Sequence, residues 1–316
     1  MTDAAADPDV DQALRTSAGA VAITRDVVVA TGPEAETYLQ GQLSQDVAAL
    51  AVGRSARALV LQPQGKVVAW LRVTRTADDT FLLDTDAGWG RELLARLQRF
   101  KLRTKVELEP ATWSCVALRG PGTDELAAGL DPAAVGAVAV VPAGWPGVAG
   151  VDLLGPTVEA PAGVETVPVA AYEVLRIESG VPAMGAEATD ATIPAELGTW
   201  LIDASVSFTK GCYTGQELVA RIDSRGSQVP RPLRGLVFAG TDVPPAGATL
   251  RASAEAVAGA KELGHVTSAA WSPGLGAPIG LGIVGRAVEP GSEVVASWDG
   301  GEATARVEVL PLVAPA

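Results

Sequence analysis

The last part of the chain alternates short apolar runs with turn residues, and this pattern limits its fold more than any other feature. We expect strands at Leu233–Ala239, Ala248–Arg251, Gly264–Ser268, Leu281–Ala287, Glu293–Ser297 and Thr304–Val309. Strands this short, separated by turn signals, predict a small antiparallel barrel or sandwich. Pro230 and Pro232 precede the first of them and mark a linker.

The region before that linker mixes helices and strands without strict alternation, which favours the α+β class. Apolar periodicity, prolines and glycines predict helices at Pro33–Leu39, Arg91–Phe100, Val169–Ser179 and Gln216–Ile222. Strands are expected at Val27–Ala30, Ala56–Leu61, Lys66–Val73, Phe81–Asp84, Thr104–Glu109, Cys115–Leu118, Val138–Val141 and Val151–Leu154. Most of the segment 142–163 is expected to be loop.

We expect the chain to divide into three parts: a disordered acidic tail (1–15), a main α/β region (16–229) and a C-terminal β-barrel (230–316). The acidic N-terminus lacks the basic and apolar stretches of a secretory signal. No apolar run is long enough to span a bilayer. These features predict a cytoplasmic protein.

Charge and cysteine content exclude several classes of function. The net charge of −13 argues against nucleic acid or an anionic membrane as a direct partner. Two cysteines and one histidine cannot supply the four or so ligands of a protein-only zinc or iron–sulfur site, so no metal site is expected. Two distant thiols also fit a reducing compartment.

The most distinctive motif is Lys210-Gly211-Cys212-Tyr213-Thr214-Gly215-Gln216-Glu217. Its glycines let the backbone turn sharply and approach a ligand closely. Cys212 lies beside Lys210 and just before a predicted helix N-terminus, and both favour the thiolate. The alternative interpretation is a tight turn holding an inert cysteine. Cys115 lies in an apolar strand and is expected to be core.

The stretch from Phe208 to Gly226, F-T-K-G-C-Y-T-G-Q-E-L-V-A-R-I-D-S-R-G, resembles the signature of YgfZ-type folate-binding proteins, relatives of the glycine cleavage T-protein. Four further segments are similar to that superfamily in the same order: Gly32–Asp46, Leu61–Val68, Leu175–Pro182 and Gly264–Ser268. The resemblance implies two interleaved α/β subdomains around a central folate channel, followed by the barrel. The region 16–229 would then bind folate.

The resemblance also implies tetrahydrofolate, or a folate derivative, as cofactor and places its contacts in the signature. These candidates are Lys210, Gly211, Tyr213, Gly215 and Gln216, with Cys212 as a functional thiol of open role. Trp200, shortly before the signature, is a candidate wall of the channel.

Arg176 and Glu178 lie at the end of a predicted helix and allow two interpretations. They are either an exposed ion pair or part of the ligand site. An arginine fork suits a carboxylate of the folate glutamate, and the similarity at Leu175–Pro182 favours that role for Arg176. Glu178 could pair with Arg176 or accept from the ligand's amino groups, and the sequence leaves this open.

One departure from the T-protein affects the expected activity. The T-protein has an Asp pair after the Gly-Gly of the hairpin that matches 61–73, and one carboxylate is essential to its reaction. Here Val67, Val68, Ala69 and Trp70 occupy those positions. Apolar side chains cannot take a proton or stabilise a developing iminium ion. The lack is usual in the YgfZ-type subgroup, and whether the chain is an enzyme stays open.

Three other features are not expected to form sites. Gly280–Gly285 satisfies G-x-G-x-x-G but lies in the all-β part, outside the strand–turn–helix context of a dinucleotide site. His265 lies in a predicted strand and is expected to be packed or on the surface. The tryptophans are expected to be core or loop anchors, apart from Trp200.

The leading hypothesis is a monomeric, folate-binding accessory protein. The resemblance implies a role in the assembly or repair of iron–sulfur enzymes, including those that modify tRNA, with these enzymes or assembly factors as partners. The alternative is a folate-dependent one-carbon transferase or demethylase that uses Cys212 or an unrecognised acid. A scaffold in which folate is only structural is a third possibility.

Overall fold

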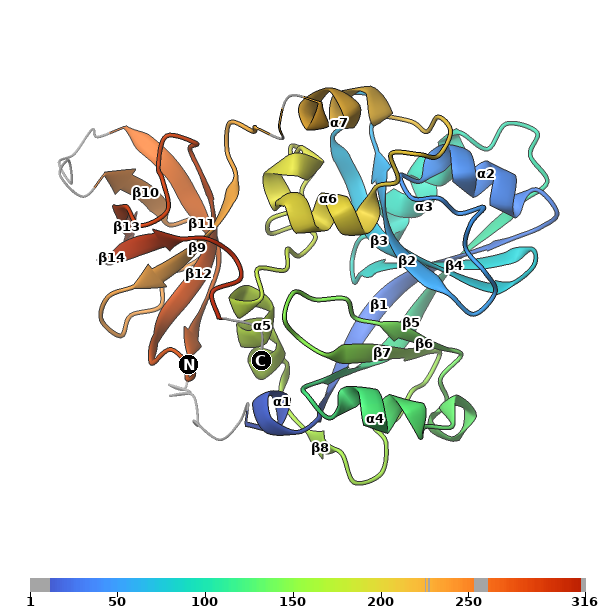
Figure 1. Ribbon diagram of the computed structural model, residues 1–316, viewed down its shortest axis with the longest axis horizontal. Coiled ribbons are helices and arrows are strands. Elements are labelled where there is room, and N and C mark those ends of the chain that lie inside the picture. The colour runs from blue at the N-terminus through green and yellow to red at the C-terminus, as the bar shows by residue number, and fades with distance from the viewer. Residues whose placement is uncertain (1–11, 225, 227, 253–260, 314–316) are drawn as a thin grey trace.

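The computed structural model describes residues 12–224, 226, 228–252 and 261–313. A large curled sheet with helices lies on one side of the molecule and a closed barrel on the other (Figure 1). Helices α5 (Val169–Glu178) and α6 (Thr199–Ser205) lie between the two bodies (Figure 1). The predicted α+β class with a C-terminal barrel is confirmed.

The sheet has eight strands in the order β2-β3-β4-β1-β5-β7-β6, with β8 paired to β1. Their bounds are β1 Gly19–Thr31, β2 Ser55–Leu61, β3 Val67–Ala77, β4 Thr80–Asp86, β5 Glu107–Arg119, β6 Ala139–Pro142, β7 Gly150–Gly155 and β8 Glu165–Thr166. The antiparallel pair β1–β5 runs through the middle and joins two halves, because β4 pairs with Arg25–Thr31 of β1 and β7 pairs with Ser114–Arg119 of β5. The two expected subdomains therefore share one continuous sheet.

These two long strands were predicted incompletely. The sequence pattern suggested a short strand at Val27–Ala30 and two separate strands at Thr104–Glu109 and Cys115–Leu118, whereas β5 is continuous. Pro110 lies where β5 has only β1 as a neighbour, and a proline is tolerated at such an edge.

Helices cover both faces of the sheet. Helices α2 (Ala35–Gln42) and α3 (Gly90–Arg99) pack on the face formed by alternate residues of β2, β3 and β4, such as Leu71 and Phe81. The other face carries Leu59 and Trp70 and packs against α6 and the segment after α5. Short helices α4 (Thr123–Ala128) and α6 were not predicted; each is too short for apolar periodicity to be recognised.

The barrel closes in the order β10-β11-β12-β9-β14-β13. Its strands are β9 Leu233–Phe238, β10 Thr249–Ala252, β11 Glu262–Ser272, β12 Ala277–Val284, β13 Glu293–Trp298 and β14 Gly301–Glu308. Most of the G-x-G-x-x-G stretch lies within β12 and opens no helix, and His265 is exposed on β11. A cluster of Ile177, Leu233, Ile279 and Leu281 packs the end of α5 onto the barrel.

The chain start corrects one expectation. Residues 12–16 form helix α1, and Ala13 and Leu14 are buried in the main core. The apolar pair needs burial, so residues 12–15 are not a disordered tail; residues 1–11 of that expected tail lie outside the described residues. Within the described ranges, no helix is long and apolar enough to cross a membrane.

Candidate ligand cavity

A cavity of about 230 Å³ lies between helix α5 and the face of the sheet that carries Trp70. Arginines, carboxylates and aromatic rings together line much of it, with Val169, Val181 and Met184 among the apolar residues. The charged and aromatic lining residues are Arg25, Arg57, Trp70, Arg72, Asp86, Trp145, Asp152, Tyr172, Glu173 and Arg176. The sequence had singled out Arg176 alone of these as a ligand contact.

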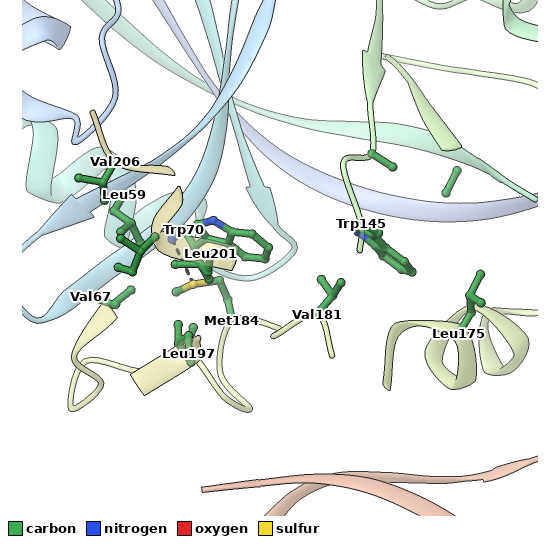
Figure 2. Close-up of a cluster of buried hydrophobic side chains, with 14 of the residues drawn as sticks. Leu59, Val67, Trp70, Trp145, Leu175, Val181, Met184, Leu197, Leu201 and Val206 are labelled. Carbon is green, nitrogen blue, oxygen red and sulfur yellow. Dashed lines mark hydrogen bonds between the residues drawn. The ribbon is translucent and has the colours of Figure 1, made fainter. Parts of the chain in front are cut away.

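Aromatic side chains form the flat walls of the cavity. The Nε1–H of Trp70 donates to Ser205 Oγ at 3.0 Å, and its ring meets Trp200 edge to face at 6.0 Å. On the other side, Trp145 lies 4.9 Å from Tyr172. Figure 2 shows Trp70 and Trp145 on either side of Val181, with Met184 beside Trp70. Rings held in this way offer stacking surfaces to a flat ligand.

Buried ion pairs form the base of the cavity. Asp84, fully buried, lies 2.9 Å from Arg25 and 2.8 Å from Arg72. Asp152 pairs with Arg72 and lies 2.7 Å from Arg119. Burial raises the pKa of Asp152, but Arg119 and Arg72 outweigh burial and hold that pKa well below its usual range. The network stays charged and fixes the side chains around the cavity.

Arg57 differs from the other arginines that line the cavity. Its guanidinium lies 4.3 Å from the centre of the Trp70 ring and donates to the carbonyl of Ala143. Its Nε is buried without a hydrogen-bond partner. Burial, followed by the nearby Arg72 and Arg25, lowers the pKa of Arg57 to about 9. Arg57 remains a cation at neutral pH with unused hydrogen-bonding capacity.

These residues meet because of strand alternation. Arg57 and Leu59 of β2 point to the same face as Trp70 and Arg72 of β3, since side chains two apart share a face. Sequence analysis did not select Arg57, Trp145 or Tyr172. One sequence signal could have indicated this cavity: charged residues within otherwise apolar strands, such as Arg72, Asp84 and Asp152.

Arg176 reaches the cavity but is already engaged. It pairs with Glu173 at 2.8 Å and with buried Glu187 at 3.2 Å, and it donates to the carbonyl of Val181 and to Ser268 Oγ of the barrel. Arg176 and Glu178 are both buried. The interpretation of these two residues as an exposed ion pair is therefore wrong.

Glu178 lies away from the cavity lining. It accepts from Arg15 at 2.9 Å and from Ser272 at 2.6 Å, and so it connects α1, α5 and the barrel. Glu178 does not pair with Arg176, and its second oxygen, Oε2, is buried without a hydrogen-bond partner.

The signature loop lies against the sheet edge and not in the cavity lining. Lys210 donates to the carbonyls of Gln40, Leu43 and Gln45 at the end of α2. A cation is favoured at a helix C-terminus, and burial lowers the pKa of Lys210 to about 8. Lys210 therefore ties the loop to α2.

The next residues of the signature fix the loop's shape. Gly215 has φ of +85°, and a Cβ there would lie 2.5 Å from the carbonyl oxygen of Gln62 in the β2–β3 turn. Gln216 begins helix α7 (Gln216–Asp223) and accepts from the backbone N–H of Tyr213. Tyr213 is buried in the main core. The loop needs these residues for close packing.

Cys212 and Gly211 are exposed positions of the loop. Cys212 is on the surface, whereas Cys115 is fully buried as expected, and burial raises the pKa of the Cys115 thiol above its usual range. Gly211 is also exposed, with no atom near the position of an added Cβ. Cys212 is thus presented to solvent on a firmly held loop.

Trp200 lies between the cavity and a second, larger space. It contacts Trp70 and also lines a cleft of about 850 Å³ between α6 and the barrel. Arg234 and Arg286 line the barrel side of this cleft. Trp200 is not among the residues that line the cavity, and its role as a wall of a folate channel stays a prediction.

The hairpin position where the resemblance places the T-protein carboxylate is apolar. Val67 and Ala69 are fully buried and Trp70 stands at the cavity. Among the described residues, no three His, Cys, Asp or Glu side chains are grouped as metal ligands.

Comparison with known proteins identifies the relatives of this chain. The GCVT N-terminal domain matches residues 11–142, and the glycine cleavage T-protein C-terminal barrel domain matches residues 231–313. An aminomethyltransferase of Rubrobacter xylanophilus is 30% identical over 314 residues, which cover 90% of this chain and 80% of that protein. A tRNA-modifying protein YgfZ of Edwardsiella ictaluri is 30% identical over 220 residues, 62% of this chain and 64% of that protein.

An uncharacterised protein of Haemophilus influenzae is 29% identical over 199 residues, and the match spans 65% of its length. The crystal structure of the glycine cleavage system aminomethyltransferase T from Bartonella henselae superposes with a TM-score of 0.76 at 23% identity, covering 97% of this chain and 89% of that one. That structure shares the fold. With both characteristic domains and full-length relatives at this identity, the chain belongs to the glycine cleavage T-protein family.

Proposed function

We propose that this protein binds tetrahydrofolate in the cavity between the sheet and α5 and acts as an accessory factor in the assembly or repair of iron–sulfur enzymes. The observation that supports this most is the lining itself, in which Trp70, Trp145 and Tyr172 stand among arginines. A folate combines flat rings, which stack on aromatic side chains, with carboxylates, which guanidinium groups bind.

An accessory role is favoured over aminomethyl transfer by the state of the cavity's carboxylates. Asp86 pairs with Arg25 and accepts from the backbone N–H of Met184, and Glu173 pairs with Arg176. A general base must be free to take a proton. Cys212, exposed on its rigid loop, is then available for thiol chemistry with a client enzyme, and tRNA-modifying iron–sulfur enzymes are among the clients proposed. We place this activity in the cytoplasm.

Two measurements test the proposal. Calorimetry with tetrahydrofolate should detect binding that Trp70→Leu weakens, while Trp271→Leu, a barrel substitution outside the cavity, should leave affinity unchanged. A deletion strain should lose activity of several iron–sulfur enzymes, and the wild-type gene, but not Cys212→Ser, should restore it. Absence of folate binding, or normal iron–sulfur enzymes in the deletion strain, would refute the proposal.

The second candidate is a folate-dependent one-carbon transferase or demethylase. The aminomethyltransferase relatives favour it. Asp86 lines the cavity and is partly exposed, and it would have to act as the base despite its pairing with Arg25. Folate-dependent turnover of a methylamine donor, abolished by Asp86→Asn in a folded variant, would establish this function instead.

A further inference from the structure

The charges that line the cavity are balanced except at one point. Arg25 pairs with Asp84 and Asp86, and Arg72 pairs with Asp84 and Asp152. Arg176 pairs with Glu173 and Glu187. Arg57 is the exception: within the part of the chain that the structure describes, no carboxylate lies within ion-pair distance of it.

Arg57 is nevertheless held in a defined position. Its guanidinium lies over the Trp70 ring, at 4.3 Å, and one Nη donates to the Ala143 carbonyl. That carbonyl belongs to the segment that also presents Trp145 to the cavity. The Nε edge of the guanidinium has no acceptor. A planar cation that lines a cavity, is fixed by a ring and a carbonyl and has no carboxylate partner is pre-organised for a planar anion.

We infer that Arg57 is the anion-binding residue of this cavity and receives a carboxylate of an aromatic ligand whose ring stacks near Trp70. The inference rests on the proposed folate function and changes its expected geometry, since Arg176 was the predicted carboxylate clamp. An incoming carboxylate would supply the missing counter-charge. At Arg176 the corresponding partners are already provided by Glu173, Glu187 and Ser268.

The electrostatic surroundings of Arg57 support the same assignment. Burial and the positive charges of Arg72 and Arg25 lower the pKa of Arg57 to about 9. A buried cation without a counter-ion is costly, and an anion that binds beside it removes part of that cost. A neutral ligand does not relieve the cost of the unpaired cation. The cavity is therefore expected to prefer anionic over neutral ligands of similar shape.

The test compares three probes on folded protein by anaerobic calorimetry. They are tetrahydrofolate, p-aminobenzoylglutamate, which keeps the carboxylates without the pterin, and 6-methyltetrahydropterin, which has no carboxylate. Arg57→Gln should weaken the first two by about thirtyfold or more, the equivalent of about 2 kcal/mol for a lost buried charge contact. It should change pterin affinity by less than about twofold. The exposed Arg54→Gln is the matched control and should change none of the three.

The outcomes separate this inference from the proposed function. If tetrahydrofolate binds and Arg57→Gln leaves its affinity unchanged, or weakens the pterin equally, Arg57 does not bind the carboxylate, although folate binding stands. If the wild type binds only p-aminobenzoylglutamate and needs Arg57 for it, the anion site stands and the folate function fails. Binding of neither carboxylate probe overturns both. Should Arg57→Gln not fold, Arg57→Lys keeps the charge without the fork, and a selective loss for the two carboxylate probes is expected.

Discussion

The substitution Asp152→Asn tests whether the buried charges behind the cavity stabilise it as the structure indicates. Asp152 is almost fully buried and serves two arginines, Arg72 and Arg119. Asparagine keeps the shape of the side chain and removes its charge. Arg72 retains Asp84, 2.8 Å away, so most of the damage falls on Arg119.

Arg119 is fully buried, and no other carboxylate pairs with it among the residues described. The acceptors that remain are neutral: the carbonyls of Leu118 and Val151, at 2.9 and 3.1 Å, and the amide oxygen of the new asparagine. Removing one partner of a buried ion pair leaves an uncompensated charge and costs about 3–5 kcal/mol. We expect Asp152→Asn to lower the free energy of unfolding by that amount, or Tm by about 10 °C.

The same substitution should also disturb the aromatic walls of the cavity. The Arg119 guanidinium lies 4.5 Å from the ring centre of Trp145 and 5.4 Å from that of Tyr172, so the network positions two aromatic walls. Tetrahydrofolate binding should weaken in Asp152→Asn even well below its unfolding temperature. Binding is measured by calorimetry on the folded variant.

The assay is urea unfolding of wild type and variant, with exposed Asp242→Asn as the control. The pKa of Asp152 is lower in the folded than in the unfolded protein. The contribution of ionised Asp152 to the free energy of unfolding is therefore fully present above its unfolded-state pKa of about 4. It is lost as the pH falls below that value. The difference between wild type and variant should narrow between pH 5 and pH 2. A difference in the free energy of unfolding below about 1 kcal/mol at pH 7, or a difference that does not change with pH, would refute a strong buried pair.

Iodoacetamide should label Cys212 in the native protein and Cys115 only after unfolding, because only Cys212 is exposed; mass spectrometry showing equal labelling would contradict this arrangement. Gly215→Ala should lower stability by about 1 kcal/mol or more, since the new Cβ would meet the Gln62 carbonyl at a positive φ; an unchanged urea midpoint would show that the turn can move. Arg176→Ala should lower stability by about 3–5 kcal/mol, because it leaves Glu187 buried without its cation, and calorimetry on the folded variant will show whether folate affinity also falls, as the sequence predicted. The purified protein should not support glycine cleavage with the other components of that system; turnover at the level of a genuine aminomethyltransferase would mean that another carboxylate, such as Asp86, acts.

Local patterns determined the elements whose signals lie within a few residues of each other. The six barrel strands and the helices α3, α5 and α7 were predicted from apolar spacing, prolines and glycines, because these report backbone preferences directly. The signature around Cys212 identified the superfamily for the same reason: its residues are contiguous. The strand pair β1–β5 was predicted only in pieces, since its continuity depends on pairing between segments far apart in the chain.

The tertiary structure alone decided which side chains surround the cavity. Arg57, Trp70, Trp145 and Tyr172 come from β2, β3, a loop and α5, and only the packing of the sheet against α5 brings them together. It also gave Lys210 its contacts with the carbonyls at the end of α2, some 165 to 170 residues earlier in the chain. The sequence therefore determined the family, the barrel and the exposed thiol's loop. The charge balance that leaves Arg57 without a counter-ion depends on distances in space between strands, which no local pattern records.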